Sequence, residues 1–166
     1  ATQSGLIQHF TKIADSIKLP VILYNVPSRT GVSCTAKTYQ TLSKHPNIIG
    51  VKEASGNHAL IQETRNCCGD DFFIWSGNDD DTTSICALGG VGVISVASNL
   101  VPQQMRELTQ LCLSGQLLEA GKKQLALFPL MQALFFEVNP IPIKTAMGHL
   151  GLCSPEVRLP MCSMEE

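Results

Sequence analysis

The chain has 166 residues, of which 44% are hydrophobic and 16% are charged, a balance typical of a globular protein with an apolar core. Its net charge of -2 offers no basic surface to nucleic acid or anionic lipid. No apolar run is long enough to cross a bilayer, because the run at 128–136 is short and is interrupted by Gln132. The segment 1–5 lacks the basic and apolar regions of a signal peptide, so none is expected there.

The cysteines indicate the redox environment. There are seven, at positions 34, 67, 68, 86, 112, 153 and 162. The number is odd and two are adjacent, which is typical neither of a disulfide framework nor of a zinc site. The simplest interpretation is a cytoplasmic protein whose thiols are reduced and mostly buried.

In chain order, the first part of the sequence alternates predicted helices with predicted strands. Apolar residues recur at helical spacing over 5–17, which predicts an amphipathic helix that Pro20 ends. Strands are then predicted at 21–24, 48–52, 72–75 and 91–96, with helices at 35–44, at 57–67 and from the acidic turn 76–81 to Leu88. The strands are continuously apolar rather than alternating, which indicates an α/β fold with parallel strands that helices cover on at least one face.

From Pro102 onward the pattern is helical. One predicted helical face carries Met105, Leu108, Leu111 and Cys112. A longer helix is predicted at 117–136, where Pro129 should produce a kink. The segment 139–144 is predicted to be an extended connector, because residues that precede proline avoid the helical region. A last helix is predicted at 145–150.

Lys52 is the most informative residue, because it ends an apolar strand just before a glycine turn. A lysine at a buried strand end loses hydration, which favours the neutral amine, and a neutral amine can attack a ketone to form a Schiff base. Tyr24, at the end of the preceding strand, offers a phenol for proton transfer, and Arg29 offers a guanidinium to a carboxylate. Together the three indicate an enzyme that handles a small keto acid.

Each of these residues also has an ordinary structural interpretation. A strand-end lysine is usually a solvated charge, and a tyrosine on an apolar run is more often a core residue with a wet hydroxyl. A surface arginine often pairs with a nearby carboxylate and contributes little. The shared location of Lys52, Tyr24 and Arg29 at successive strand ends is what favours catalysis.

Five segments, in order and at the right spacing, resemble the dihydrodipicolinate synthase family of class I aldolases, within the N-acetylneuraminate lyase superfamily. They are Tyr24-Asn25-Val26-Pro27-Ser28-Arg29-Thr30-Gly31, Gly50-Val51-Lys52-Glu53-Ala54-Ser55-Gly56, Ser76-Gly77-Asn78-Asp79, Gly92-Val93-Ile94-Ser95-Val96 and Asn139-Pro140-Ile141-Pro142-Ile143-Lys144. The resemblance implies condensation of pyruvate with aspartate semialdehyde to 4-hydroxy-tetrahydrodipicolinate in lysine (diaminopimelate) biosynthesis. It also implies a homo-oligomer, usually a tetramer.

The resemblance assigns a role to each matching residue. Lys52 matches the Schiff-base lysine and Tyr24 the tyrosine that relays protons. Arg29 matches the arginine that binds the semialdehyde carboxylate, and Gly77 and Ile94 match positions that line the pyruvate pocket, mostly through backbone atoms. No metal or organic cofactor is implied, because the iminium on the lysine itself acts as the electron sink.

The implied fold is a (β/α)8 TIM barrel followed by a C-terminal helical region. Only four strands are predicted here, so residues 1–101 are expected to be the second half of the barrel and 102–166 a helical region that is incomplete at its end. In the family the upstream half carries a Gly-Thr-Thr-Gly-Glu type motif and a second tyrosine, and neither occurs here. We therefore expect a fragment that is poorly active alone, with the missing N-terminal half of the barrel as a partner.

Two other functions stay open at this point. One is another pyruvate-dependent sugar-acid aldolase or lyase of the same superfamily, although these generally lack an arginine at the place of Arg29. The other is a non-catalytic scaffold or regulatory fragment, although a scaffold needs none of Tyr24, Arg29 and Lys52.

Overall fold

The computed structural model describes residues 1–165, which form two compact units. The first runs from Ala1 to Ile94 and the second from Ser95 onward. None of the helices in the described residues combines the length and the hydropathy that a membrane span requires.

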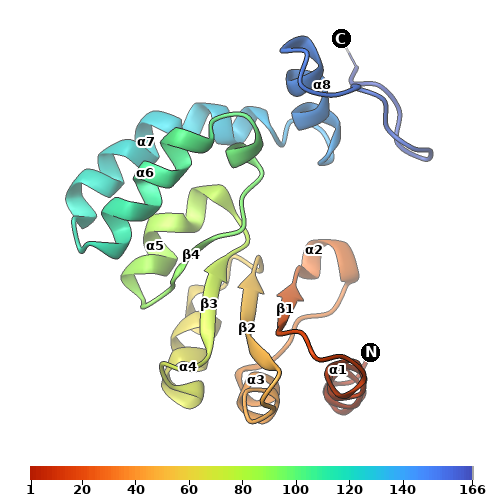
Figure 1. Ribbon diagram of the computed structural model, residues 1–166, viewed down its shortest axis with the longest axis vertical. Coiled ribbons are helices and arrows are strands. Elements are labelled where there is room, and N and C mark those ends of the chain that lie inside the picture. The colour runs from red at the N-terminus through yellow and green to blue at the C-terminus, as the bar shows by residue number, and fades with distance from the viewer. Residues whose placement is uncertain (166) are drawn as a thin grey trace. The chain divides into compact units, whose positions relative to one another are not determined.

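The first unit alternates helices with strands, as the apolar pattern predicts. Its elements are α1 (Gln3–Ser16), β1 (Val21–Asn25), α2 (Pro27–Thr30), α3 (Ala36–Leu42), β2 (Ile48–Glu53), α4 (His58–Cys68), β3 (Phe73–Ser76), the 3-10 turn η1 (Asp79–Asp81), α5 (Thr82–Ala87) and β4 (Gly92–Val93). The strands form one parallel sheet in the sequential order β1-β2-β3-β4 (Figure 1). The predicted α/β class with a parallel sheet is confirmed.

The core of this unit lies between the sheet and its helices. Leu23, Val51 and Ile74 are ladder partners on neighbouring strands, and each is at most 2% exposed. They belong to one cluster with apolar side chains of the helices, among them Leu42 of α3 and Ile61 of α4. Burying each large apolar side chain stabilises the fold by about 1.5–3 kcal/mol, so this side of the sheet carries most of the packing energy.

The opposite face of the sheet is open, and we call it the open face. Successive side chains of a strand point to opposite sides, so the neighbours of the core residues lie here. Ile22, Tyr24 and Phe73 are 38%, 50% and 39% exposed. An apolar sheet face of this kind is normally covered.

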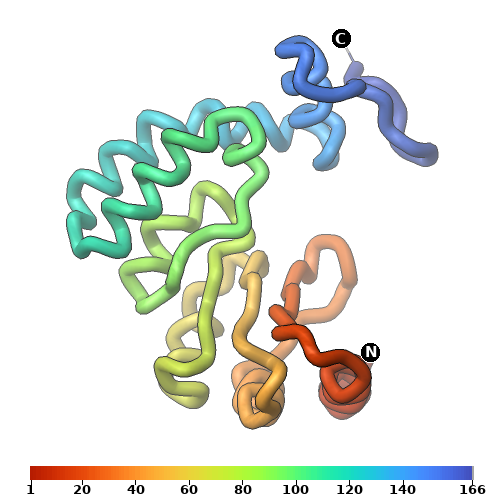
Figure 2. Tube along the Cα trace, in the orientation of Figure 1, coloured from red at the N-terminus to blue at the C-terminus, as the bar shows by residue number. Residues whose placement is uncertain are grey.

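The second unit is helical and contains the 3-10 turn η2 (Ala97–Asn99), α6 (Pro102–Leu113), α7 (Leu117–Ala133) and α8 (Ile141–His149). The chain trace shows α6 and α7 side by side, joined by a short turn (Figure 2). Met105 and Leu108 of α6 and Ala120 and Met131 of α7 are almost fully buried. The predicted apolar face of α6 is therefore confirmed at its centre.

One prediction about a proline-containing segment is wrong, and one helix that begins at a proline was not predicted. The segment 139–144 is not an extended connector, because α8 already begins at Ile141 and Lys144 donates its N–H to the Pro140 carbonyl. Pro27 opens the short helix α2, for which no prediction was made from the sequence. In both cases proline lies in the first helical turn, where an N–H has no acceptor within the helix and its loss costs nothing.

Some predicted boundaries also differ from the structure. The ladder of β4 covers only Gly92–Val93 rather than 91–96, although Ile94 still donates its N–H to the Ser76 carbonyl. The helix α7 ends at Ala133 rather than at 136. Helix and strand ends are set by local hydrogen bonds that an apolar pattern does not reveal.

Candidate active site

Tyr24 and Lys52 meet at the carboxyl ends of two adjacent strands. They are ladder partners across β1 and β2, and Lys52 is in turn the ladder partner of Trp75 on β3. Ladder partners in a parallel sheet point to the same side, so the three side chains form a row on the open face. The Lys52 Nζ lies 4.2 Å from the centroid of the Tyr24 ring. The structure thus brings together the two residues predicted to do the chemistry.

Both side chains can be reached from solvent. Tyr24 is 50% exposed and Lys52 is partly exposed. The aromatic rings of Tyr24 and Trp75 flank the strand that carries the amine. A small molecule that approaches the open face would therefore meet an amine beside a phenol ring.

Arg29 lies in α2, which follows β1 directly. It is exposed in the last turn of this helix, and none of the hydrogen bonds or ion pairs shown for residues 1–165 involves its guanidinium. Because α2 leaves the carboxyl end of β1, Arg29 is at the same end of the sheet as Tyr24 and Lys52. The position suits a group that receives a carboxylate from solvent.

Gly77 follows β3 and packs against the end of β2. Its N–H donates to the Glu53 carbonyl over 2.7 Å. A Cβ at this position would lie 2.5 Å from the Ala54 Cβ and 3.0 Å from the Glu53 carbonyl oxygen, so only glycine fits. Because its N–H already serves the sheet, a role of Gly77 toward a substrate would have to use its carbonyl group.

The backbone N–H of Ile94, like that of Gly77, is already used within the sheet. Its N–H donates to the Ser76 carbonyl over 2.9 Å, and its side chain is 37% exposed. The predicted backbone role of Gly77 and Ile94 is thus restricted to acceptor groups, and neither is placed to donate to a carboxylate through the backbone.

Glu53 is a buried acid that the sequence interpretation did not single out. It is 3% exposed, and its carboxylate accepts hydrogen bonds from Asn25 Nδ2 (2.9 and 3.1 Å), from the Tyr39 hydroxyl (2.9 Å) and from the Ser55 N–H (2.9 Å). Asn25 in turn accepts from the Cys34 N–H over 3.1 Å. These residues form a hydrogen-bond network on the helix side of the sheet, which we call the Glu53 network.

Burial governs the titration of the groups around Glu53. Desolvation, and then the charge of Glu53, raise the pKa of Tyr39 far above its ordinary value. Desolvation also raises the pKa of Cys34, while a hydrogen bond with Tyr39 opposes the rise. Tyr39 is therefore a permanent hydrogen-bond donor to the carboxylate.

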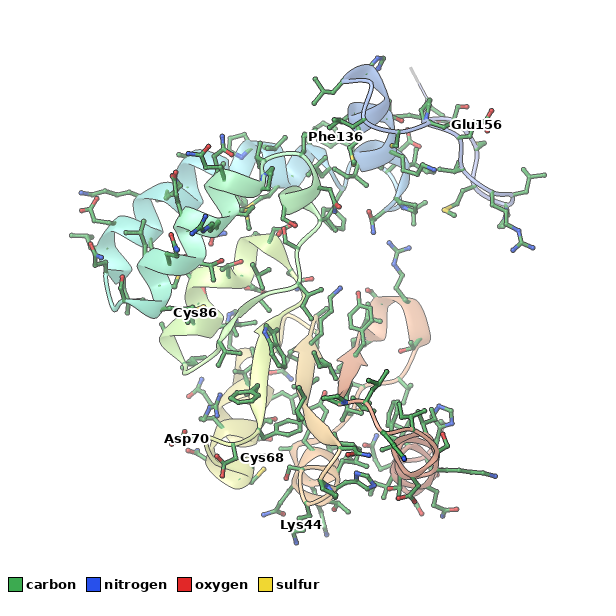
Figure 3. The ribbon with its side chains drawn as sticks, viewed as in Figure 1. Lys44, Cys68, Asp70, Cys86, Phe136 and Glu156 are labelled. Atoms are coloured by element: carbon green, nitrogen blue, oxygen red, sulfur yellow. The ribbon has the colours of Figure 1, made fainter. Side chains whose placement is uncertain are left out.

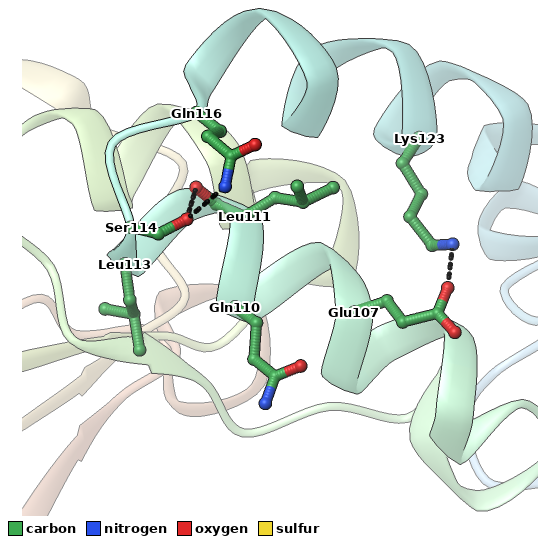
Figure 4. A pocket seen from close by; sticks show the side chains of 7 residues that line it. All are labelled: Glu107, Gln110, Leu111, Leu113, Ser114, Gln116 and Lys123. Atoms are coloured by element: carbon green, nitrogen blue, oxygen red, sulfur yellow. Dashed lines mark hydrogen bonds and ion pairs between the residues drawn. The ribbon is translucent and has the colours of Figure 1, made fainter.

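No metal site accompanies this arrangement in the described residues, where no group of three or more His, Cys, Asp or Glu side chains is placed to hold an ion. A separate hollow lies in the second unit and is lined by Glu107, Gln110, Leu111, Leu113, Ser114, Gln116 and Lys123 (Figure 4). Its charged groups are an ion pair of Lys123 with Glu107, and the hydrogen bond from Lys123 lowers the pKa of Glu107. The Lys123 amine is engaged in this ion pair, so Lys52 and its neighbours are the better candidate.

Comparison with known proteins gives one consistent answer. Residues 1–166 match the model of the dihydrodipicolinate synthetase family. A 4-hydroxy-tetrahydrodipicolinate synthase from Alkaliphilus oremlandii (strain OhILAs) is 51% identical over 165 residues, which are 99% of this chain and 57% of the relative. The enzyme of the same name from Clostridium novyi (strain NT) is 47% identical, again over 99% of this chain and over 56% of the relative.

Solved structures agree with the sequences. The dihydrodipicolinate synthase from Thermotoga maritima has a TM-score of 0.96 at 41% identity, covering 100% of this chain and 58% of that one. The chloride-inhibited synthase from Acinetobacter baumannii, complexed with pyruvate, has a TM-score of 0.96 at 36% identity, covering 100% and 57%. This chain spans a little over half the length of these relatives. It belongs to the dihydrodipicolinate synthetase family.

Proposed function

We propose that these residues are part of a 4-hydroxy-tetrahydrodipicolinate synthase, a cytoplasmic lyase of lysine biosynthesis that condenses pyruvate with aspartate semialdehyde. The observation that carries the proposal is the placement of the Lys52 amine 4.2 Å from the Tyr24 ring, at adjacent strand ends. The pyruvate complex of the Acinetobacter baumannii relative supports the first substrate.

The proposed chemistry begins with attack of the Lys52 amine on the keto carbon of pyruvate. Loss of water gives an iminium, and loss of a proton from the methyl group then gives an enamine. The enamine carbon attacks the aldehyde of the semialdehyde, which restores an iminium on Lys52. The amino group of the semialdehyde then attacks the iminium carbon, which closes the ring and releases the Lys52 amine. Each step moves a proton, and the Tyr24 phenol is the group beside the amine that is suited to carry it.

Arg29 is proposed to bind the carboxylate of the semialdehyde. A guanidinium can bind a carboxylate with two parallel hydrogen bonds, and Arg29 is exposed at the correct end of the sheet. We further propose that Gly77 and Ile94 line the pyruvate pocket, with their carbonyl groups toward it.

The fold supports a proposal about the complete enzyme. Four parallel strands in sequential order, with helices on one face and an exposed apolar face on the other, are what half of a (β/α)8 barrel should show. We propose that residues 1–101 form the second half of such a barrel, that 102–166 form a C-terminal helical region, and that the N-terminal half covers the open face. The complete enzyme is proposed to be a homotetramer, and this chain alone to be poorly active.

The test is reductive trapping of pyruvate, followed by peptide mapping. Two proteins should be compared, the 166-residue chain and the same chain joined to the N-terminal part of the Alkaliphilus oremlandii relative. We expect a reduced pyruvyl adduct on Lys52 in the joined protein, less of it in the chain alone, and none on the exposed Lys37. Labelling of Lys37 and Lys52 alike in both proteins would contradict the proposal.

The second substrate is tested by substituting Arg29. In the joined protein, Arg29→Ala should weaken the use of aspartate semialdehyde at least about tenfold and leave the trapping of pyruvate within about twofold, because a lost charged hydrogen bond costs roughly 1.5–3 kcal/mol. Equal loss for both substrates, or cleavage of a sugar acid by the unsubstituted protein, would favour the sugar-acid aldolases instead.

A further inference from the structure

The Glu53 network lies directly behind the candidate active site. Asn25 and Glu53 are ladder partners, and they are the residues that follow the ladder partners Tyr24 and Lys52. Side chains alternate along a strand, so Tyr24 and Lys52 point to the open face while Asn25 and Glu53 point to the helices. The buried pair Asn25 and Glu53 therefore links the same two strands directly next to Tyr24 and Lys52.

This cross-link fixes the relative position of the two strand ends. Asn25 Nδ2 on β1 contacts both carboxylate oxygens of Glu53 on β2, at 2.9 and 3.1 Å. One backbone bond, from the Ala54 N–H to the Asn25 carbonyl over 2.9 Å, continues the ladder beyond it. A shift of β1 along β2 would break both links at once, and this shift is the movement that would separate Lys52 from the Tyr24 ring.

The carboxylate is also held from two other directions. The Tyr39 hydroxyl anchors it to α3, and the Ser55 N–H anchors it to the loop after β2. Each oxygen of Glu53 thus accepts two hydrogen bonds, and Asn25 uses its own Oδ1 to accept the Cys34 N–H. Hydrogen bonds of this number and direction allow one side-chain position only.

Burial of an acid without a cationic partner costs free energy of desolvation. None of the groups that contact the carboxylate is a lysine or an arginine, and an apolar side chain would fill the space without the cost of removing a charge from water. A fully hydrogen-bonded network of this kind fixes a defined geometry, which an apolar side chain would not.

We propose that Glu53 is a positioning residue, whose carboxylate, through Asn25, holds the Lys52 amine against the Tyr24 ring. The proposal rests on the function proposed above for Lys52. Glu53 touches no substrate, and it acts by fixing the offset between β1 and β2. Reacting groups that are misplaced by about 1 Å can lose on the order of 100-fold in rate.

Glu53→Gln is the direct test, because it keeps the size of the side chain. Both oxygens of Glu53 accept hydrogen bonds, so the new amide NH2 must face a donor in either orientation. If this variant does not fold, Asn25→Ala removes the same cross-link and leaves the donors Tyr39 and Ser55 in place. Thr38→Val is the matched control, because Thr38 is 1% exposed and its hydroxyl donates to Gln3 Oε1 of α1 rather than to Glu53.

Two measurements, made on the 166-residue chain joined to the N-terminal part of the Alkaliphilus oremlandii relative, decide the matter. The first is the rate of pyruvate trapping on Lys52 as a function of pyruvate concentration. We expect the maximal rate to fall by at least about tenfold in Glu53→Gln or Asn25→Ala, with the half-saturating concentration of pyruvate unchanged, and to stay within about threefold in Thr38→Val. A purely structural role would lower the rates of Glu53→Gln and Thr38→Val in parallel with their stabilities.

The second measurement does not depend on pyruvate. Acetylation of Lys52 by acetic anhydride is compared with that of Lys44, which is exposed just past the end of α3 (Figure 3). Release of Lys52 from the Tyr24 ring should raise this ratio at least about twofold in Glu53→Gln and Asn25→Ala, and not in Thr38→Val. An unchanged ratio overturns the positioning role. Absence of trapping in the unsubstituted joined protein together with a raised ratio would overturn the function proposed for Lys52 and leave its positioning standing.

Discussion

Replacing Gly50 with alanine should strongly destabilise the first unit, because the added methyl group has no space between β2 and β3. Gly50 lies in β2 beside Phe73 of β3. A Cβ at this position would clash with the Phe73 carbonyl oxygen, and it would lie 2.8 Å from the carbonyl carbon and 2.9 Å from Cζ3 of Trp75. Two of these three neighbours are backbone atoms, which cannot move without moving the strand.

The expected loss of stability has two contributions, the overpacking of the site and the weakening of hydrogen bonds between β2 and β3. Overpacking of a tight site costs about 1–3 kcal/mol. Separation of β2 from β3 also weakens about two ladder hydrogen bonds, at roughly 1 kcal/mol each. We therefore expect Gly50→Ala to lower the free energy of unfolding by about 3–5 kcal/mol. With an m value of about 2 kcal/mol/M, the urea midpoint should fall by roughly 1.5–2.5 M.

The assay uses the single tryptophan, Trp75, whose fluorescence reports the unfolding of the sheet beside the substitution. Gly121→Ala is the control, because a Cβ there has no heavy atom within 4 Å and alanine in a helix interior gains about 0.5–1 kcal/mol. Gly121 lies in α7 of the second unit, so this variant is followed by circular dichroism at 222 nm, a wavelength at about the helical minimum. A midpoint for Gly50→Ala within about 0.3 M of the unsubstituted chain would refute the close approach of β2 and β3.

Two further predictions concern the opposite end of the sheet. Arg65→Ala should lower the free energy of unfolding by about 2–4 kcal/mol, because the guanidinium donates to the carbonyls of Gly69, Phe72 and Gly89. Arg65→Lys should not restore the stability, because one ammonium cannot reach all three carbonyls. Urea unfolding followed by Trp75 fluorescence measures both effects. Cys68, at the end of α4 (Figure 3), has a pKa raised to about 12, first by burial and then by the neighbouring Cys67 thiol, so iodoacetamide at pH 8 should alkylate it at least about tenfold more slowly than the exposed Cys153. The folded state favours the neutral thiol of Cys68, so this stabilisation is present below pH 9.0 and is lost as the pH rises toward about 12. Unfolding curves of Cys68→Ala should lack this pH dependence. Equal alkylation rates for Cys68 and Cys153 would contradict the raised pKa.

The sheet of the first unit could be predicted from the sequence because of how parallel strands are buried. Strands that helices cover read as continuous apolar runs, and three of the four predicted strands match β1, β2 and β3 within about one or two residues. The fourth run is equally apolar, yet only Gly92–Val93 pairs with β3. Apolarity records burial, whereas a ladder also needs a partner strand at the correct distance.

The short helices were beyond the reach of the same reasoning. α2 and α8 each begin at or just before a proline, and the sequence Asn139-Pro140-Ile141-Pro142 suggests an extended segment when each proline is considered alone. A proline in the first turn is compatible with a helix, but whether that turn forms depends on how the next residues of the chain pack. In α8 that packing buries Ile141 and Ile143, and both are only 5–6% exposed.

In the candidate site, Lys52 and Tyr24 could be predicted from the sequence, whereas the role of Glu53 could not. Lys52 and Tyr24 stand out because a polar group that ends an apolar run is visible in one dimension. Glu53 is one residue further along, where an acid beside a lysine suggests a solvated pair, and nothing in the run tells which residue faces water. Only the pleat of β2 assigns Lys52 to the open face and Glu53 to the core. A usable signal was the equal placement of Asn25 and Glu53, each directly after a candidate catalytic residue on neighbouring strands. Ladder partners point to the same side of a sheet, so two polar partners lie within reach of each other.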